Sequence, residues 1–378
     1  MKIVFVGLSS FYTVGMRYQD NLFCKCFLDR GHNVVFISNP EKYVNGIIEY
    51  TGAEDKVLSD GLHLIRDDFR YGYFFSKIFK TYKNIYNYLE TINPDIIYCH
   101  GTQYFNIFDV VAYKKRHKDA VIYADTHTSF INCKKGFFSY WLLYKMYYRH
   151  LYKTIEPYLE KYFYIGLGEK EFSEKVYSAD SSKMEFLPLG GEEISNEEYS
   201  KHRKEIRDKY NIDNDDIMLF HSGKLLKGKN TDWIINAINK VNKNNVKLFI
   251  AGSIPEENKE LKNRIISNKN IIYIGWISGD ELVKYLCACD LYCQPGTPSV
   301  TLQTAICSKT PIICYKHDFY SYLYDYNSIL WINNVDDIVA CISNIVNNRT
   351  NLEVLKKNAD KNSYKLDTAY LLSKALGV

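Results

Sequence analysis

Short, almost continuously apolar segments alternate with longer segments of helical periodicity along the whole chain. The apolar segments are residues 2–7, 32–38, 95–100, 121–126 and 162–168, and then 217–222, 246–252, 270–276, 290–294 and 311–315. Apolar runs of this length without alternation are typical of parallel strands that are buried on both faces. Helical stretches lie between them, for example at 18–30 and 73–91, and another covers residues 352–376. The pattern predicts an α/β protein.

The strand–helix alternation stops once, in the polar, glutamate- and lysine-rich stretch 191–216, which follows Gly190. A chain of 378 residues is also too long for one ordinary core. We therefore expect an N-terminal domain at 1–190, a C-terminal domain at 191–355, and a final helix at 356–378 that packs back toward the N-terminal domain. Helices on both faces of two parallel sheets predict two doubly wound, Rossmann-like domains that face a cleft.

Composition excludes several classes of protein. Apolar residues make up 46% and charged residues 24%, which is typical of a globular chain. The net charge of +4 is too small for a dedicated duplex-DNA binder, and we expect no nucleic-acid partner. The first apolar segment is the length of a strand and lacks a cleavage site for a signal peptide. The ten cysteines include no C-x-x-C pair, which favours reduced core thiols in a cytoplasmic protein.

Two turns in the second half are suited to binding anions. The stretch GKLLKGKN (223–230) places three lysines between a predicted strand and a helix, and PGTPS (295–299) follows another strand. Small-residue turns at helix starts leave backbone N–H groups free to hold phosphate, so two such turns with lysines nearby predict a diphosphate site. The D-x-D sequence Asp213–Asp215 lies in a polar connection, and we interpret it as a turn rather than a metal site.

These segments resemble those of GT-B-fold glycosyltransferases of family 4, which move a sugar from a nucleotide sugar, and in particular bacterial members that build surface polysaccharide such as capsule or lipopolysaccharide. The resemblance covers essentially the whole chain and is strongest in residues 217–315 and in the first 35 residues. It implies the GT-B fold, a nucleoside diphosphate sugar as donor, and no requirement for a metal or other cofactor.

The resemblance implies a set of donor contacts. Lys224 and Lys229 would grip the diphosphate, with Lys227 as the competitor for the second role. The remaining donor-binding positions are Gly15, Gly223, Trp276, Ile277, Gly296, Ser299, Val300 and Gln303. The family also has a Glu-x7-Glu motif, from which this sequence departs because Pro295 stands at the first glutamate and Gln303 at the second. An amide can still bond ribose hydroxyls, whereas proline cannot replace a carboxylate. Ser299 either binds phosphate or only caps the following helix.

In the first half, His127 follows the predicted strand 121–126, where the family often has a histidine close to the reaction centre. Asp125 beside it and His100 at another strand end are acceptor-side candidates. Two interpretations remain open for the aromatic and basic stretch 137–153: a helix at a membrane interface that meets a lipid-linked acceptor, or an amphipathic helix half buried in its own domain.

The function implied is transfer of a glycosyl group from a nucleoside diphosphate sugar to a hydroxyl of a glycan or lipid-linked acceptor, at the inner face of the cytoplasmic membrane. The family retains anomeric configuration without a protein nucleophile. Two alternatives stay open: a sugar-nucleotide epimerase, which would need carboxylates and histidines lining the cleft, and a non-catalytic GT-B partner that binds nucleotide or supports another transferase. Loss of the first glutamate motivates the second alternative.

Overall fold

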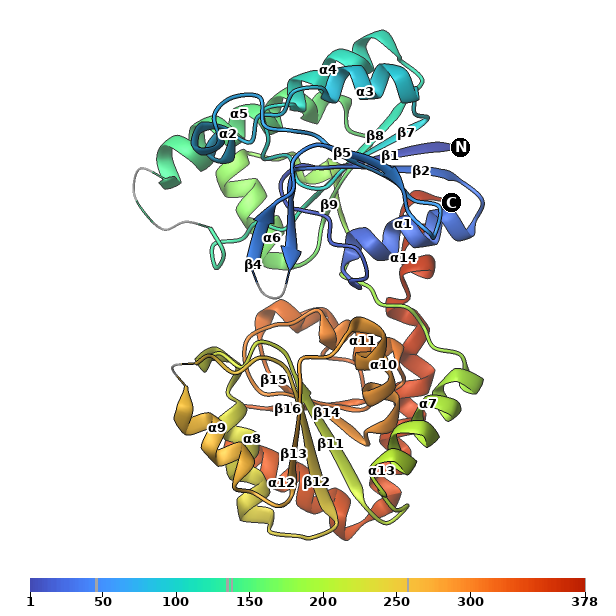
Figure 1. Cartoon of the computed structure of the whole chain (residues 1–378), viewed down its shortest axis with the longest axis vertical. Helices are drawn as coiled ribbons and strands as arrows, with labels where there is room; N and C mark the ends of the chain where they lie inside the picture. The colour runs from blue at the N-terminus through green and yellow to red at the C-terminus, as the bar shows by residue number, and fades with distance from the viewer. Residues whose placement is uncertain (45–46, 134–135, 137–138, 257, 378) are drawn as a thin grey trace. The chain divides into compact units, whose positions relative to one another are not determined.

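The computed structural model describes the chain except for residues 45–46, 134–135, 137–138, 257 and 378. It divides into two compact units, Met1–Pro188 and Leu189–Val378 (Figure 1). Each unit is an α/β structure with its own sheet, as the hydrophobic pattern predicted. The C-terminal helical residues belong to the second unit, and their packing toward the N-terminal domain stays a prediction.

The first unit contains an eight-stranded sheet. Its strands, in spatial order, are β10 (Met184–Phe186), β9 (Lys161–Tyr164), β8 (Val121–Thr126), β7 (Ile96–Cys99), β1 (Lys2–Gly7), β2 (Asn33–Ser38), β6 (His63–Arg66) and β5 (Glu54–Val57). All neighbours are parallel except β5 and β6, so this sheet is mixed rather than purely parallel. A separate antiparallel pair consists of β3 (Glu41–Val44) and β4 (Ile47–Tyr50).

The helical segments of the first unit are α1 (Gln19–Asp29), α2 (Tyr73–Phe79), α3 (Ile85–Ile92), α4 (Ile107–Arg116), the π-helix η1 (Ser139–Tyr148), α5 (Arg149–Ile155), α6 (Leu167–Phe172) and the π-helix η3 (Ser173–Tyr177), with 3₁₀ turns η2 (Glu156–Tyr158) and η4 (Ser181–Lys183). The single helix predicted at 73–91 is wrong, because Lys80 takes a left-handed conformation (φ 50°) that ends α2. The strand predicted at 162–168 is too long, since α6 begins at Leu167.

Alternate residues of β1 contribute to different faces of the first sheet. Val4 and Val6 belong to a buried cluster with residues of α3, α4 and α5. Phe5 points to the opposite face, where its ring packs on Phe23 and Phe27 of α1 at centroid distances of 6.5 and 5.9 Å. Figure 1 shows α1 on one side of this sheet and α3 and α4 on the other. Burial on both faces explains the continuous apolar runs in the sequence.

The second unit has a six-stranded, wholly parallel sheet. Its strands, in spatial order, are β13 (Ile271–Gly275), β12 (Val246–Ala251), β11 (Ile217–Ser222), β14 (Leu291–Gln294), β15 (Ile312–Tyr315) and β16 (Ile329–Ile332). Ile217 and Leu219 of β11 pack in one buried cluster, while Met218 and Phe220 pack in another on the opposite face. The strand predictions in this half are confirmed, and β16 is an additional strand.

The helical segments of the second unit are α7 (Asn196–Lys209), η5 (Lys227–Lys229), α8 (Thr231–Val241), α9 (Lys259–Ile266), α10 (Gly279–Ala288), α11 (Thr301–Cys307), η6 (Asp318–Leu323), α12 (Val335–Asn347), α13 (Arg349–Asn362), η7 (Ser363–Leu366) and α14 (Thr368–Leu376). The D-x-D sequence is a turn, as predicted, closed by a hydrogen bond from Asp216 N to Asp213 O (3.0 Å). All ten cysteines are free thiols, and nine of them are buried. None of the helices in the described part of the chain is long and apolar enough to cross a membrane.

Candidate functional site

Glycines close the carboxyl ends of three neighbouring strands in the second unit. Gly223, Gly252 and Gly275 follow or end β11, β12 and β13, and each has a positive φ. Gly252 N donates to Gly275 O at 2.7 Å, and Gly223 N donates to Ala251 O at 3.0 Å. A Cβ on Gly252 would lie 1.8 Å from the main-chain oxygen of Gly223. The strand ends are therefore drawn together so closely that only glycine fits, which holds the lysine loop that follows Gly223 in place.

Gly252→Ala is expected to lower the free energy of unfolding of the second unit by about 3 kcal/mol, through backbone displacement added to left-handed strain. Gly275→Ala is the control, because this glycine also has a positive φ (74°) but has open space around its Cβ, and the substitution should cost about 1 kcal/mol. Urea unfolding followed by tryptophan fluorescence measures both, since Trp233, Trp276 and Trp331 lie in this unit. Equal losses in the two variants would contradict the close-approach argument.

Lys229 is held at the junction of the two turns predicted from the sequence. Its Nζ donates to Thr297 O (3.1 Å) and Pro298 O (3.3 Å), and Thr297 N donates back to Gly228 O (2.8 Å). Burial lowers the pKa of Lys229 below its ordinary value. Among the described residues it bonds two carbonyl oxygens and no carboxylate. A half-buried ammonium group without a carboxylate partner is stabilised by any anion that reaches it.

The turn at 295–299 packs directly on the lysine loop. A Cβ on Gly296 would lie 2.2 Å from Gly228 O, so this glycine permits the contact. Asn230, which has a left-handed conformation (φ 52°), donates from Nδ2 to Pro295 O (3.0 Å). The structure thus brings together Gly296 and Lys229, as expected for one anion site. Lys224 and Lys227 lie in the same loop with exposed side chains.

His221 supports this junction, although the sequence analysis did not single it out. It is fully buried at the end of β11, where Nδ1 pairs with Cys293 O (2.8 Å) and Nε2 with Thr231 Oγ1 (3.0 Å). Burial lowers its pKa to about 4, so the imidazole is neutral at physiological pH. His221 ties β11 to β14 and to the first residue of α8. The sequence feature that could have identified His221 is a histidine near the end of an apolar strand.

The prediction that Ser299 caps the following helix is wrong. α11 begins at Thr301 with Val300 in the cap position, and no side chain makes a cap hydrogen bond there. Ser299 Oγ donates to Thr301 Oγ1 (3.2 Å) and makes a long contact with Thr301 N (3.4 Å), while Ser299 N donates to Tyr320 Oη at 2.8 Å. The proline-containing turn delays the helix by two residues. Ser299 and Val300 still lie beside the lysine loop, and their contact with the donor remains a prediction.

Gln303 is wholly enclosed within α11, with 0% of its surface exposed. In the orientation that satisfies its amide, the nitrogen donates to Val300 O (3.1 Å) and Ser299 O (3.3 Å), and the oxygen accepts from Tyr322 Oη (2.9 Å). This amide now supports the turn at 295–300. Contact with a ribose remains a prediction, and it requires these bonds to rearrange.

Trp276 lies in the loop after β13, and its side chain is 57% exposed. The structure therefore excludes a buried structural role for this ring, which was the competing interpretation. Ile277 is half-buried and packs against the core before α10, whose start has a capping box formed by Ser278 and Glu281. An exposed indole at a strand end is available to stack on a base, and this role for Trp276 remains a prediction.

The three candidates of the first unit lie together. His100 follows β7, Asp125 is the fifth residue of β8, and His127 follows β8. His100 Nδ1 lies 3.2 Å from Asp125 Oδ2, His127 Nε2 lies 3.3 Å from the same oxygen, and the two rings are 4.4 Å apart. Gly101 N donates to Asp125 Oδ1 (2.9 Å) and Tyr98 Oη to Oδ2 (3.1 Å). The buried Asp125 carboxylate is thus the centre of the cluster.

Asp20, in the first turn of α1, completes this group and was missed by the sequence analysis. Its Oδ1 lies 3.0 Å from His100 Nδ1. Burial alone would lower the pKa of His100, but Asp125 and Asp20 outweigh it and raise that pKa to about 9. Burial would raise the pKa of Asp125, but the two imidazoles hold it well below its usual value. At neutral pH His100 is therefore a cation between two carboxyl groups.

A small pocket opens beside His127. It has a volume of about 140 Å³, and its lining includes Ser9, His100, Thr126, His127 and Thr128. His127 Nε2 lies 3.3 Å from Asp125 Oδ2 and is itself buried, and it makes no hydrogen bond of good geometry to any described residue. Gly15 lies in the loop before α1 with a positive φ (78°) and open space around it, and its donor contact remains a prediction.

His100, Asp125 and His127 are also spaced like metal ligands, because one ligand atom from each lies within 4.8 Å of the others. A proton on His100 would compete with a metal ion for this group. A histidine with a pKa of about 9 is protonated at neutral pH and has no lone pair at Nδ1 to offer a metal. Asp125 already accepts hydrogen bonds from Gly101 N and Tyr98 Oη, one at each carboxylate oxygen.

Comparison with known proteins agrees with this architecture. Residues 202–362, somewhat less than half of the chain, match the family model described as glycosyl transferases group 1. Anabaena HepE, solved with UDP and glucose, has a TM-score of 0.68 at 10% identity over 100% of this chain and 98% of that one. WaaG, a glycosyltransferase involved in lipopolysaccharide biosynthesis, has a TM-score of 0.65 at 16% identity over 99% and 98%. Sucrose-phosphate synthase from Thermosynechococcus elongatus has a TM-score of 0.65 at 13% identity over 99% and 97%.

No curated protein sequence matches the chain. Identities this low establish the fold and leave the reaction open. The match to the family model lies in the second unit and includes the lysine loop, the turn at 295–299 and α11. Residues 202–362 thus carry a glycosyl transferases group 1 domain, and the chain as a whole has the GT-B fold.

Proposed function

We propose that this protein is a glycosyltransferase that moves a sugar from a nucleoside diphosphate sugar to an acceptor hydroxyl. The observation that carries the proposal is Lys229, a half-buried cation bonded only to carbonyl oxygens among the described residues, at the end of the central strand. Phosphate oxygens are the ligands such a group binds best. The match to glycosyl transferases group 1 and a fold shared with a protein solved with UDP-glucose support the same conclusion.

In the proposed reaction the bond between the anomeric carbon and the diphosphate oxygen breaks, and a bond from the acceptor oxygen to that carbon forms. The leaving diphosphate gains negative charge, which Lys229 and Lys224 stabilise. The acceptor proton passes to the departing phosphate, so no protein base is required. We propose a retaining outcome and a family 4 type of mechanism on this basis.

The first unit would receive the acceptor at the pocket beside His127. His127, which lines this pocket, contacts substrate hydroxyls, and Asp125 positions its ring through Nε2. His100 is a positioning residue, since its charge fixes Asp125 in the ionised form. We propose a glycan or lipid-linked acceptor in surface-polysaccharide synthesis at the inner face of the cytoplasmic membrane.

A nucleotide-release assay with purified protein and a panel of nucleoside diphosphate sugars tests this function. Slow release of nucleoside diphosphate from one donor would identify the sugar and the base. Thermal stabilisation by each nucleotide, measured in parallel, detects binding without turnover. Binding without release, even with acceptors present, would favour the non-catalytic partner; conversion of the sugar without release of nucleotide would favour the epimerase; absence of both binding and release would defeat the proposal.

Removal of divalent cations is expected to leave activity within about twofold. In this proposal the positive charge at the diphosphate comes from lysines, and His100, whose pKa is raised to about 9, is a cation at neutral pH. The measurement is nucleotide release before and after treatment with EDTA, followed by addition of Mg²⁺ or Mn²⁺. A loss above tenfold that either ion restores would contradict a metal-independent mechanism.

A further inference from the structure

The helix α2 has its apolar side chains outside. Its sequence is YFFSKIF, and only Ser76 is buried. Tyr73, Phe74, Phe75 and Ile78 are exposed, with 79% of Phe74 accessible. A surface helix of a globular protein normally turns such residues inward. The reversed orientation indicates that this helix meets something apolar outside its own domain.

Polar contacts hold α2 in this orientation. Ser76 Oγ accepts from Tyr71 N (2.9 Å) and from Thr81 Oγ1 (3.0 Å), so the helix is anchored through its one small hydroxyl. Tyr73 Oη and Lys77 Nζ both donate to Glu41 Oε1, at 3.0 and 2.8 Å. These bonds attach α2 to the rest of the unit through Ser76, Tyr73 and Lys77, and they leave Phe74 and Phe75 exposed.

The π-helix η1 extends this apolar surface. Tyr147 Oη donates to Phe79 O (2.9 Å), and the two rings are 5.3 Å apart, which joins η1 to α2. Tyr144 and Tyr148 of η1 are buried, whereas Trp141, Leu142 and Met146 are exposed. The stretch 137–153 is therefore half buried, as one interpretation held, and its outer face is apolar as the other required. Residues 137–138 lie outside the described part of the chain.

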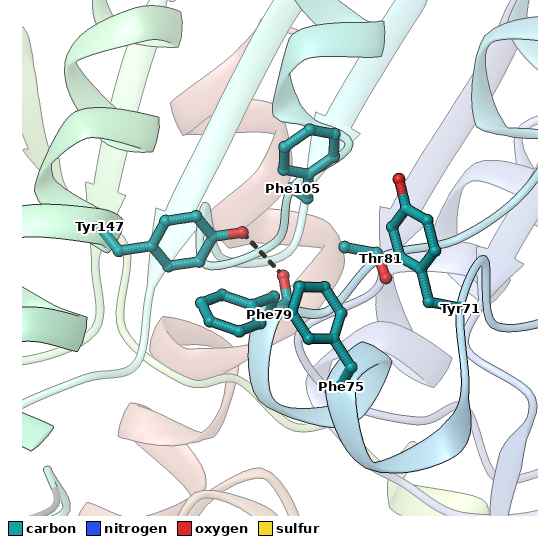
Figure 2. A pocket seen from close by; sticks show the side chains of 6 residues that line it. All are labelled: Tyr71, Phe75, Phe79, Thr81, Phe105 and Tyr147. Carbon is teal, nitrogen blue, oxygen red and sulfur yellow. Dashed lines mark hydrogen bonds between the residues drawn. The ribbon is translucent and has the colours of Figure 1, made fainter.

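A pocket lies at the junction of these two helices (Figure 2). Its volume is about 410 Å³, within the range of sites that hold small organic molecules, roughly 300–1,000 Å³. Thr81 and five aromatic residues line it: Tyr71, Phe75, Phe79, Phe105 and Tyr147. Figure 2 shows the rings of Phe75, Phe79, Phe105 and Tyr147 gathered around one space. A lining of this kind suits a hydrocarbon chain.

Positively charged residues are concentrated in the segments that contain α2 and η1. Residues 69–89 and 127–155 together contain nine lysines and arginines and no aspartate or glutamate, whereas the whole chain has a net charge of +4. The rest of the chain is therefore net negative. Three of the nine, Lys77, Lys83 and Lys153, pair with carboxylates outside these segments. Lys145 lies 4.3 Å from the ring centroid of Trp141, and Arg149 is exposed one turn further along. Basic groups beside exposed aromatics are complementary to anionic lipid headgroups above acyl chains.

We propose that the surface formed by α2 and the outer face of η1 docks on a bilayer of anionic phospholipid, with the pocket at Phe75 and Phe79 taking one acyl or isoprenoid chain. Phe74, Trp141 and Met146 would enter the interface while Lys145 and Arg149 meet headgroups. This docking proposal uses residues of the first unit alone, and it does not depend on whether the protein transfers a sugar.

Co-sedimentation of the full chain with vesicles tests the proposal, using phosphatidylcholine alone and phosphatidylcholine with 30% phosphatidylglycerol as a test composition. We expect binding to the anionic vesicles at least tenfold tighter than to the neutral ones, weakening as salt rises. F74S/F75S should weaken it by about tenfold or more through lost apolar burial. Val57→Ser and Ile266→Ser, exposed apolar residues outside the surface, serve as controls and should bind like the wild type.

Two further measurements keep the outcomes distinct. Nucleotide-induced thermal stabilisation of F74S/F75S should match the wild type, which shows a folded protein and separates this test from that of the transferase. Sedimentation velocity without vesicles shows whether a second copy covers the surface instead. Equal binding to both vesicle types, equal binding by F74S/F75S, or a dimer that this variant dissociates would each overturn the proposal.

Discussion

Lys229→Ala is expected to lower kcat/KM for the nucleotide sugar by roughly 10²–10³-fold, the usual effect of removing one preorganised charge from a developing anion. The loss should be mainly in kcat, because the diphosphate carries more charge in the transition state than in the bound donor. Stability should change little, since the variant also removes a half-buried cation whose pKa burial already lowers. Steady-state nucleotide release and thermal unfolding provide the two measurements.

Lys227→Ala is the matched control, because Lys227 lies in the same loop with its side chain exposed. It should retain activity within about threefold, as expected for a screened surface charge. If Lys227→Ala is the more damaging variant, Lys227 rather than Lys229 grips the diphosphate, which was the open alternative from the sequence. If neither variant affects release, neither Lys227 nor Lys229 grips the diphosphate, and the role proposed for Lys229 is wrong.

The strands that build both sheets were readable because burial on two faces leaves an unbroken apolar run, as in residues 217–222. Of the four edge strands, β13 was readable, whereas β5, β10 and β16 were not. β5 (Glu54–Val57) has the sequence EDKV and is mostly exposed, so its hydrogen bonds to β6 define it rather than its composition. α2 and α3 were merged because both are aromatic-rich, and only the left-handed turn at Lys80 separates them.

The residues of the candidate site were likewise predictable from the sequence only in part. Carboxyl ends of parallel strands converge, so His100, Asp125 and His127 could be grouped from their positions after apolar runs. Asp20 could not, because it comes from the first turn of a helix and approaches His100 only through packing of α1 on the sheet. Gln303 was assigned to a ligand, yet its burial within α11 depends on Tyr322 from a distant segment.

Asp125→Asn is expected to lower the free energy of unfolding at pH 7 by about 3 kcal/mol, because it takes the main counter-charge from a buried imidazolium. In the wild type the His100 pKa is about 9, above its ordinary value of 6.5. The contribution of the His100 charge to the free energy of unfolding is therefore fully present below pH 6.5 and is lost as the pH rises through 9. In the variant only Asp20 remains, so the His100 pKa falls and this dependence between pH 7 and 9.5 shrinks. NMR titration of the histidines and urea unfolding as a function of pH measure the two effects.

Asp119→Asn is the control, since Asp119 is an exposed carboxylate in the same unit and should reproduce the wild-type pH profile. Activity separates the roles further. If Asp125 positions His127, the variant should also lose kcat by roughly 10²-fold at pH 7, and lowering the pH to recharge His100 should not restore it. If His100 titrates near 6.5 in the wild-type protein, the paired-charge description of this cluster is wrong, and its neutral imidazoles would then be free to bind a cation.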